Sequence, residues 1–124
     1  QSELVGVDFS DVQMPKSNFE FAILAYAKMD HSNFADSDFS NADLHNVKFV
    51  KSNLENAIFI NADLRGANLE GANLTGANLT HAILDGANLI DAKLDIYSAD
   101  SASFCGTVMP DGHTTPKCSK KTKH

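Results

Sequence analysis

A large apolar residue recurs at every fifth position along almost the whole chain. The series runs from Leu4 to Met109 in one unbroken frame of 22 units, and it consists of Leu, Phe or Met except at Ala99. Two positions before each of these residues stands a small or slim side chain, namely Ala, Ser, Val or Thr, and Tyr97 is the exception. Because Tyr97 and Ala99 belong to the same unit, we expect a large and a small side chain to exchange places there with little change of volume.

A period of five fits neither a helix nor a straight strand. At about 100° per residue, five steps turn an α-helix by roughly 140°, so the apolar residues would wind around it without forming a face. Side chains alternate along a strand, so residues five apart point to opposite sides. The pattern therefore requires a chain that bends once per unit. The second corner position often carries residue types that tolerate turns, namely Gly66, Gly71, Gly76, Gly86, Asn41, Asn46, Asn56 and Asn61.

The repeat resembles the pentapeptide repeat proteins. The resemblance is clearest in the units Ala67-Asn68-Leu69-Glu70-Gly71, Ala72-Asn73-Leu74-Thr75-Gly76 and Ala77-Asn78-Leu79-Thr80-His81, and it extends over about nine-tenths of the chain. It implies an all-β fold, a right-handed quadrilateral (four-sided) β-helix solenoid with four units per coil. Twenty-two units would then form about five and a half coils.

The pattern stops near Met109, and a different kind of segment follows. We expect a pentapeptide-repeat β-helix over residues 1–111 and a C-terminal cap with a basic tail over residues 112–124. Thr115-Pro116 could begin a short helix, with Thr as its cap and Pro in its first turn. Cys105 and Cys118 are the only cysteines. We expect a disulfide between them to staple the cap; two free thiols in a reducing compartment are the alternative.

The charge is divided unevenly. Residues 1–111 contain 16 acidic and 6 basic groups, a net charge of −10, whereas residues 112–124 contain four lysines and no acidic group. An acidic body repels phosphate, so we expect no nucleic acid as a partner. No run of about 18 apolar residues is present, so we expect no membrane-spanning segment.

No constellation of catalytic or metal-ligating residues is evident. On a four-sided solenoid, His31, His45 and His81 fall on different sides or corners. His113, Cys105 and Cys118 could supply three zinc ligands, but their spacing matches no common zinc motif. We therefore expect no catalytic residue, no cofactor and no metal site, and we expect that the protein is not an enzyme.

One outer side carries more apolar residues than a polar solenoid surface needs. Val5, Ile23 and Ala25 are expected on this side, with Phe21 and Tyr26 at its two corners. Clustered exposed apolar groups often mark contact surfaces, so these residues are a candidate partner surface. The alternatives are that residues upstream of Gln1 cover them or that they seal the first coil.

These observations favour a non-enzymatic structural or protein-interaction module, monomeric, with an unknown protein partner. The alternative is a DNA-mimicking inhibitor of DNA gyrase, as some pentapeptide repeat proteins are described. The sequence Met109-Pro110-Asp111-Gly112 resembles the ending of family members from photosynthetic organisms, some of them exported. With the expected disulfide, this implies an extracytoplasmic location, the thylakoid lumen or the periplasm, after removal of a leader. A cytoplasmic location is the alternative.

Overall fold

Backbone pairing joins residues that are 20 positions apart. In the structure, a computed structural model that describes residues 3–95 and 98–118, parallel bridges link Glu3 to Ile23, Ile23 to Asp43 and Asp43 to Asp63, and this register continues to Asn88 and Val108. Two bridges lengthen into the short strands β1 (Asn73–Leu74) and β2 (Lys93–Leu94), which pair in parallel. Since a unit has five residues, each turn of the chain contains four units.

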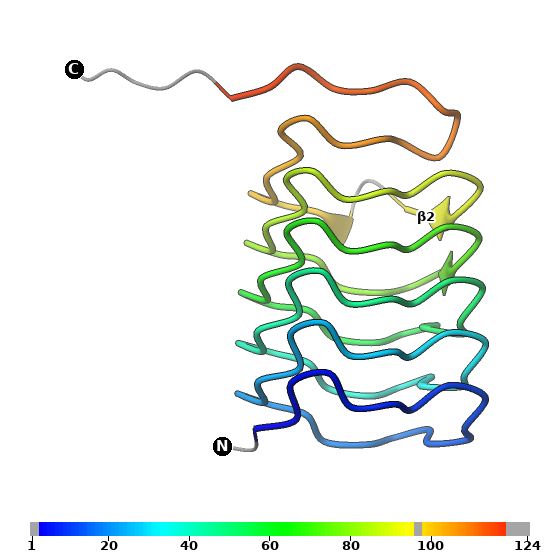
Figure 1. Cartoon of the computed structure of the whole chain (residues 1–124). Helices are drawn as coiled ribbons and strands as arrows, with labels where there is room; N and C mark the ends of the chain where they lie inside the picture. Colours follow the sequence, from blue (N-terminus) through cyan, green and yellow to red (C-terminus); the bar gives the residue numbers. More distant parts are fainter. Residues whose placement is uncertain (1–2, 96–97, 119–124) are drawn as a thin grey trace.

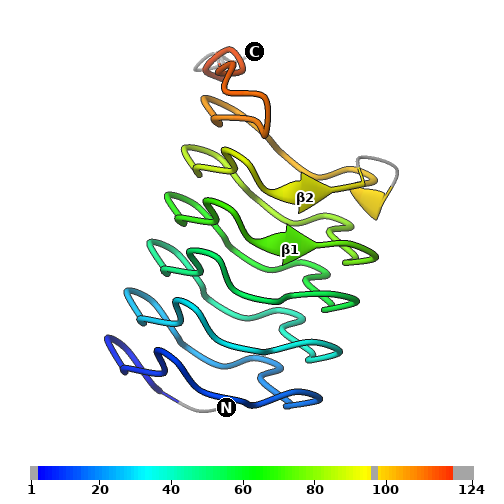
Figure 2. The same ribbon diagram turned by 90° about the vertical axis from the view of Figure 1, so that its right-hand side faces the viewer.

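The turns lie on top of one another, and the two ends of the chain lie at opposite ends of the stack (Figure 1). Figure 2 shows β1 and β2 one above the other on the same side of this stack. The described residues contain no α-helix. The expected β-helix solenoid is therefore confirmed, whereas its handedness and its number of coils stay predictions. Tyr97 lies outside the described residues, so the proposed exchange with Ala99 also stays a prediction.

Each corner is a β-turn that begins at the large apolar residue. The amide of Ala67 donates to the carbonyl of Leu64, at 3.0 Å, and Gly66 between them has a φ of +69°. A left-handed third residue is the hallmark of the type II turn. Gly, Asn or Asp fills that position in most units, since these residues tolerate it best.

In many units, an Asn or Asp directly before the large apolar residue stabilises the turn at the corner. Its side-chain oxygen accepts a hydrogen bond from the amide two residues later, as Asn68 does from Glu70 at 3.1 Å and Asn78 from Thr80 at 3.0 Å. This local bond satisfies an amide that would otherwise have no partner at the turn. In the units that have Asn or Asp at this position, that residue therefore points outward, as the sequence suggests, and has a structural role as well.

The interior is a packed column of apolar side chains. Leu and Phe from successive turns are almost completely buried, and the rings of Phe19, Phe39 and Phe59 stack with centroids 5.1 Å apart. The Ser and Thr residues at small positions bond to backbone inside the stack: the hydroxyl of Ser32 donates to the carbonyl of Phe9 at 2.6 Å, and that of Thr107 donates to Leu84 at 2.7 Å. The buried polar groups therefore join neighbouring turns.

The C-terminal segment covers the last turn without forming a helix. Thr114 pairs with Val108 in an antiparallel bridge, and the amide of Gly106 donates to the carbonyl of Pro116 at 2.9 Å. The expected helix at Thr115-Pro116 is wrong, because the amide and hydroxyl of Thr115 are already bonded to Thr107 and Phe104 along an extended path. The domain boundary at residue 111 stays a prediction.

Candidate interaction surface

One side of the stack carries exposed apolar residues, a cluster of charged or titratable groups and the disulfide. We call this side the first face; it consists of residues 3–6, 21–26, 41–46, 61–66, 81–86 and 101–106. Two ladders of outward side chains run along it. One ladder contains Glu3, Ile23, Asp43, Asp63, Ile83 and Ser103. By the same register of 20, the other contains Val5, Ala25, His45, Arg65, Asp85 and Cys105.

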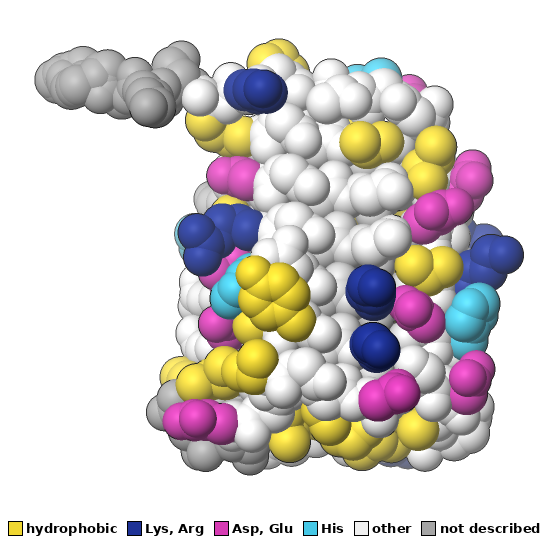
Figure 3. All heavy atoms as spheres, viewed as in Figure 1, with side chains coloured by type: hydrophobic (Ala, Val, Ile, Leu, Met, Phe, Trp, Pro, Cys, Tyr) yellow, Lys and Arg dark blue, Asp and Glu magenta, His cyan; other side chains and the backbone are white. Residues whose placement is uncertain are grey.

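Among the described residues, the large hydrophobic side chains with high exposure all belong to the first face. They are Val5 at 61%, Tyr26 at 57%, Phe21 at 56% and Ile83 at 38%. Phe21 and Tyr26 stand at the two corners, as the sequence predicts. Figure 3 looks onto the neighbouring side of the stack and shows hydrophobic side chains at its left edge and at the end where the chain begins. Scattered exposed apolar residues are ordinary, but their restriction to one side is typical of a contact surface.

The composition of this surface differs from the sequence-based expectation at two residues. Ala25 was expected to point outward into solvent, but only 3% of its surface is exposed. Its single methyl group is too short to project beyond Val5 and His45, which occupy the same ladder in the adjacent turns. Ile23 lies on the face but is half-buried. Ile83 was missed, although a register of 20 places it in the ladder of Ile23.

Phe21 and Tyr26 occupy backbone positions that disfavour them. Their φ angles are +60° and +62°, in the left-handed region. Bulky residues rarely adopt this conformation, whereas Gly, Asn and Asp adopt it more readily. The folding of the corner therefore does not explain an aromatic residue at either position. Strained residues often mark functional sites, so both are candidates for contact with a partner.

The middle of the first face contains a cluster of four charged or titratable groups. His45 Nδ1 lies 2.6 Å from Asp43 Oδ1, and Arg65 Nη2 lies 2.6 Å from Asp63 Oδ2. The guanidinium of Arg65 also donates to Asp63 through Nε at 2.8 Å. Asp43 and Asp63 are direct bridge partners, so their carboxylates repel each other, and the guanidinium of Arg65 offsets this repulsion.

The pair of Asp63 and Arg65 changes the pKa of both groups. Burial raises the pKa of Asp63, but hydrogen bonds from the side chain and backbone of Arg65 outweigh it, so this pKa lies below its ordinary value of 3.8. The hydrogen bond to Asp63 and its negative charge raise the pKa of Arg65. Both groups are therefore held in their charged forms.

This cluster was not predicted from the sequence, because His45 meets two aspartates that are 2 and 18 residues away in the chain rather than another histidine. Oxygen or nitrogen atoms of Asp43, His45 and Asp63 all lie within 4.8 Å of one another, close enough for a metal ion. However, Asp63 is already bonded to Arg65, a cation that would compete with a metal ion for its carboxylate. The absence of a metal stays a prediction.

A shallow hollow opens beside the cluster. It has a volume of about 370 Å³ and is lined by His45, Asn46, Arg65 and Gly66. The ring of Tyr26 meets the ring of His45 edge to face, with centroids 5.2 Å apart. Tyr26 occupies the corner ladder of Asn46 and Gly66, one turn nearer the N-terminus. An exposed aromatic side chain therefore stands at the border of a polar depression.

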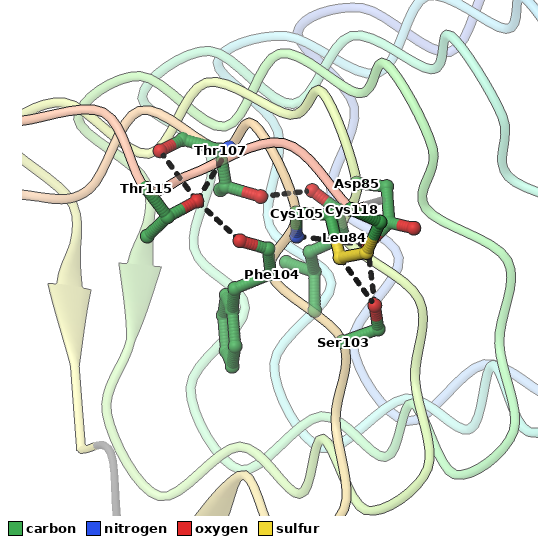
Figure 4. The surroundings of a disulfide bond; sticks show 8 residues. All are labelled: Leu84, Asp85, Ser103, Phe104, Cys105, Thr107, Thr115 and Cys118. Carbon is green, nitrogen blue, oxygen red and sulfur yellow. Dashed lines mark hydrogen bonds between the residues drawn. A yellow bond between two sulfur atoms is a disulfide. The ribbon is translucent and has the colours of Figure 1, made fainter. Parts of the chain in front are cut away.

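The C-terminal end of the first face is joined to the cap. Cys105 and Cys118 form a disulfide, with Cα atoms 5.2 Å apart, and Figure 4 shows its surroundings. Asp85 accepts hydrogen bonds from the hydroxyl of Ser103 at 2.5 Å and from the amide of Cys105 at 3.0 Å. Asp85 and the two sulfur atoms lie close enough to hold a metal, but sulfurs bonded to each other offer no thiolate ligand. His113 instead pairs with Asp111 at 2.5 Å.

No helix that could span a membrane is present among residues 3–95 and 98–118. The described part of the chain also offers no enclosed pocket in which catalytic groups converge; the hollow beside His45 is open to solvent.

Comparisons with known proteins agree with this architecture. No curated protein sequence matches the chain. Among solved structures, Rfr23, a pentapeptide repeat protein from the cyanobacterium Cyanothece 51142, is 32% identical with a TM-score of 0.50, over 91% of this chain and 90% of that one. A pentapeptide repeat protein from Nostoc PCC 7120 is 22% identical with a TM-score of 0.71, over 83% and 84%.

A pentapeptide repeat protein of the Arabidopsis thaliana thylakoid lumen is 24% identical with a TM-score of 0.59. That match covers 80% of this chain and 66% of the Arabidopsis protein, so the chain spans slightly less than two thirds of it. The family model for pentapeptide repeats matches residues 2–41, 37–76 and 72–95, with eight copies. The chain therefore belongs to the pentapeptide repeat family.

Proposed function

We propose that this chain is a non-enzymatic, monomeric protein-interaction module whose first face binds a protein partner. The observation that carries the proposal is the restriction of Val5, Phe21, Tyr26 and Ile83, the exposed large hydrophobic residues of the described chain, to that face. Inter-turn hydrogen bonds and a packed core hold the backbone that carries these side chains. Little conformational entropy would then be lost on binding, which favours affinity.

The disulfide supports an extracytoplasmic location for this module. Cys105 and Cys118 lie in bonding geometry at the end of the first face, and disulfides persist in oxidising compartments. The likeness to a thylakoid-lumen protein of Arabidopsis points in the same direction. We propose the thylakoid lumen or the periplasm. Mass measurement of the native protein under non-reducing conditions tests the bond, since the oxidised form lacks two hydrogens.

The binding role is tested by replacing the two corner aromatics with residues that the corners accept. Phe21→Asn/Tyr26→Asn removes both rings and suits the left-handed backbone. Lys16→Asn/Lys51→Asn is the matched control, because Lys16 and Lys51 are exposed corner residues with φ of +59° and +54° outside the first face. We expect photo-cross-linking in an extract of the source organism to capture proteins with wild type and control but not with the aromatic variant.

A purified partner should then bind the Phe21→Asn/Tyr26→Asn variant at least roughly tenfold more weakly than the control. Equal capture and equal affinity for both variants would show that the first face is not the binding surface.

The acidic charge of the body supports a second candidate, DNA mimicry directed at gyrase. Residues 1–111 have a net charge of −10. However, Lys28, Lys48 and Arg65 interrupt the acidic surface on adjacent turns, unlike the even negative charge of a duplex. A supercoiling assay separates the two candidates: we expect no inhibition of gyrase at micromolar protein, and clear inhibition would favour the second candidate.

A further inference from the structure

Two lysines are stacked directly on each other next to the first face. Lys28 and Lys48 are parallel bridge partners in the ladder that begins at Asp8 and continues to Asn68. Both side chains are exposed. Figure 3 shows a pair of basic side chains stacked in the middle of one face, with an exposed hydrophobic side chain beside it. Like charges at opposed positions of a sheet are destabilising, so this arrangement is unfavourable for folding.

A second stacked pair of like residues, elsewhere in the chain, has closer side-chain partners. Asp43 lies 2.6 Å from the imidazole of His45, and its bridge partner Asp63 lies 2.6 Å from the guanidinium of Arg65. Within residues 3–95 and 98–118, no ion pair involves Lys28 or Lys48.

The nearest carboxylates on the side of the lysines have backbone partners. Asp8 accepts a hydrogen bond from the amide of Ser10 at 3.0 Å, and Asp30 accepts one from the amide of Val50 at 2.7 Å. Asp8 also attracts Lys28 electrostatically. Because no carboxylate of the described residues forms an ion pair with Lys28 or Lys48, both ammonium groups can still pair with a negative group from outside the chain.

An aromatic side chain lies beside this lysine pair. Tyr26 precedes Lys28 by two residues, at the corner between the first face and the side that bears the lysines, and it is 57% exposed. The hollow lined by His45, Asn46, Arg65 and Gly66 lies on the same corner, toward the C-terminal end. A ligand that reaches the lysines can thus place an apolar group against the ring of Tyr26.

We propose that Tyr26, Lys28 and Lys48, which we call the basic corner, bind an acidic peptide segment of a protein partner. Carboxylates of the segment would pair with the lysines, and an adjacent apolar or aromatic side chain would pack on Tyr26. Charge-assisted hydrogen bonds to ammonium groups are among the stronger polar contacts. This inference rests on the proposed interaction function and names the chemical class of the partner.

The rest of the surface favours a short acidic peptide over an extended polyanion. The chain has a formal net charge of −6, and Asp8 in the ladder of the two lysines and Asp30 in the neighbouring ladder lie close to the pair. A nucleic acid or an anionic membrane would extend beyond the basic corner and meet this negative surface, which would repel it. A peptide with a few carboxylates beside one apolar residue fits within the corner.

Matched peptides test this proposal. The probes are three synthetic ten-residue peptides with one central phenylalanine flanked on both sides by two glutamates, two glutamines or two lysines. Fluorescence anisotropy should show that the glutamate peptide binds at least roughly tenfold more tightly than the glutamine peptide, and that the lysine peptide binds least. Raising the salt from about 50 to about 300 mM should weaken the glutamate complex.

Protein variants locate the binding. Lys28→Gln/Lys48→Gln should abolish the preference for glutamate, whereas Lys16→Gln/Lys51→Gln, which removes the same charge elsewhere, should keep it. Tyr26→Asn should weaken the glutamate and glutamine peptides equally. Circular dichroism melting of each variant checks that the fold is retained.

Two results would overturn the proposal. One is equal binding of the glutamate and glutamine peptides. The other is tighter binding of single-stranded DNA, or of vesicles with about 30% anionic lipid, than of the glutamate peptide, with the same dependence on Lys28 and Lys48. If cross-linking still captures a partner through Phe21 and Tyr26, either result removes the acidic-peptide class while the interaction function stands.

Discussion

At the scale of the residue, burial and corner geometry decide what each position tolerates. Phe39 and Phe21 are the same residue type in opposite environments: Phe39 is fully buried between two stacked rings, whereas Phe21 is 56% exposed at a corner. Replacing Phe39 removes packed atoms and leaves a cavity. Replacing Phe21 removes a side chain that mostly contacts water.

We therefore expect Phe39→Ala to lower the free energy of unfolding by about 3–5 kcal/mol, and Phe21→Ala to change it by less than about 0.5 kcal/mol. Urea denaturation followed by circular dichroism measures both. A similar loss for the two variants would contradict the assignment of core and surface.

Two corner glycines have similar backbone angles but different surroundings. Gly66 and Gly86 have φ of +69° and +71°. A Cβ on Gly66 would lie 2.4 Å from Asn46 Oδ1, whereas a Cβ on Gly86 would meet no atom nearer than 3.9 Å. We expect Gly86→Ala to cost about 1 kcal/mol for the left-handed backbone alone. Gly66→Ala should cost more, because Asn46 must also move.

The same urea experiment compares these two variants. In an Asn46→Gly background, which removes the contact and suits the left-handed φ of +58° at residue 46, the cost of Gly66→Ala should fall to that of Gly86→Ala. If the two substitutions cost the same in the wild-type background, the contact with Asn46 does not constrain the corner.

Asp63 makes the stability of the fold depend on pH. Its pKa lies below 3.8 in the folded protein, so its ion pair with Arg65 stabilises the fold fully at pH values above about 4, and this contribution is lost as the pH falls through the folded pKa. Asp43, His45 and Asp85 are the other titratable groups near this pair. The Tm of wild type should therefore exceed that of Asp63→Asn near pH 6, and the difference should shrink toward pH 2.5. A difference that is independent of pH would contradict this account.

At the scale of the element, the cap closes one end of the solenoid through both hydrogen bonds and a covalent bond. The amides of Gly106 and Thr107 donate to Pro116 and Thr115, and the disulfide closes a loop of 13 residues in sequence separation. In the chain-entropy account, a loop of this length contributes at most about 3 kcal/mol. The cap should therefore loosen before the rest of the stack when the bond is removed.

We expect Cys105→Ser/Cys118→Ser to speed hydrogen exchange at the amides of Gly106 and Thr107, while Leu54 in the middle of the stack keeps its protection. In a solenoid, each turn contacts only its neighbours, so the effect should decay along the rod. Uniform loss of protection throughout the chain would contradict a local role for the cap.

The sequence could not predict the form of this element. Thr115-Pro116 has the residue types of a helix start. However, this local pattern carries no information about the last turn of the solenoid, which lies next to the segment in the fold. Backbone groups of Phe104, Gly106 and Thr107 offer hydrogen bonds that an extended segment can use at once. Hydrogen bonds to the last turn therefore override the local preference for a helix.

At the scale of the whole molecule, the five-residue period predicted one bend per unit, and the resemblance to the pentapeptide repeat proteins implied the four-sided β-helix. A chain with a large apolar residue at every fifth position must turn once per unit to bury them all, and the structure has this corner at unit after unit. The exposed corner positions of Phe21 and Tyr26 followed from the same frame. The fold was therefore within reach of the sequence because one local rule repeats along the chain.

Contacts that depend on stacking were harder to predict. Three features depend on residues in the adjacent turn, about 20 positions away. They are the cluster of Asp43, His45 and Asp63, the stacked pair of Lys28 and Lys48, and the burial of Ala25. They emerge only when neighbouring turns are compared side chain by side chain.

The central claim is that successive turns stack with a register of 20 residues. In this register, the amide of Leu44 donates to the carbonyl of Asp63 at 2.7 Å. The most direct measurement is the scalar coupling across that hydrogen bond, detected by NMR in protein labelled with ¹⁵N and ¹³C. We predict a coupling from the Leu44 amide to the Asp63 carbonyl; a coupling to the carbonyl of Ser40, as an α-helix would give, would contradict the account.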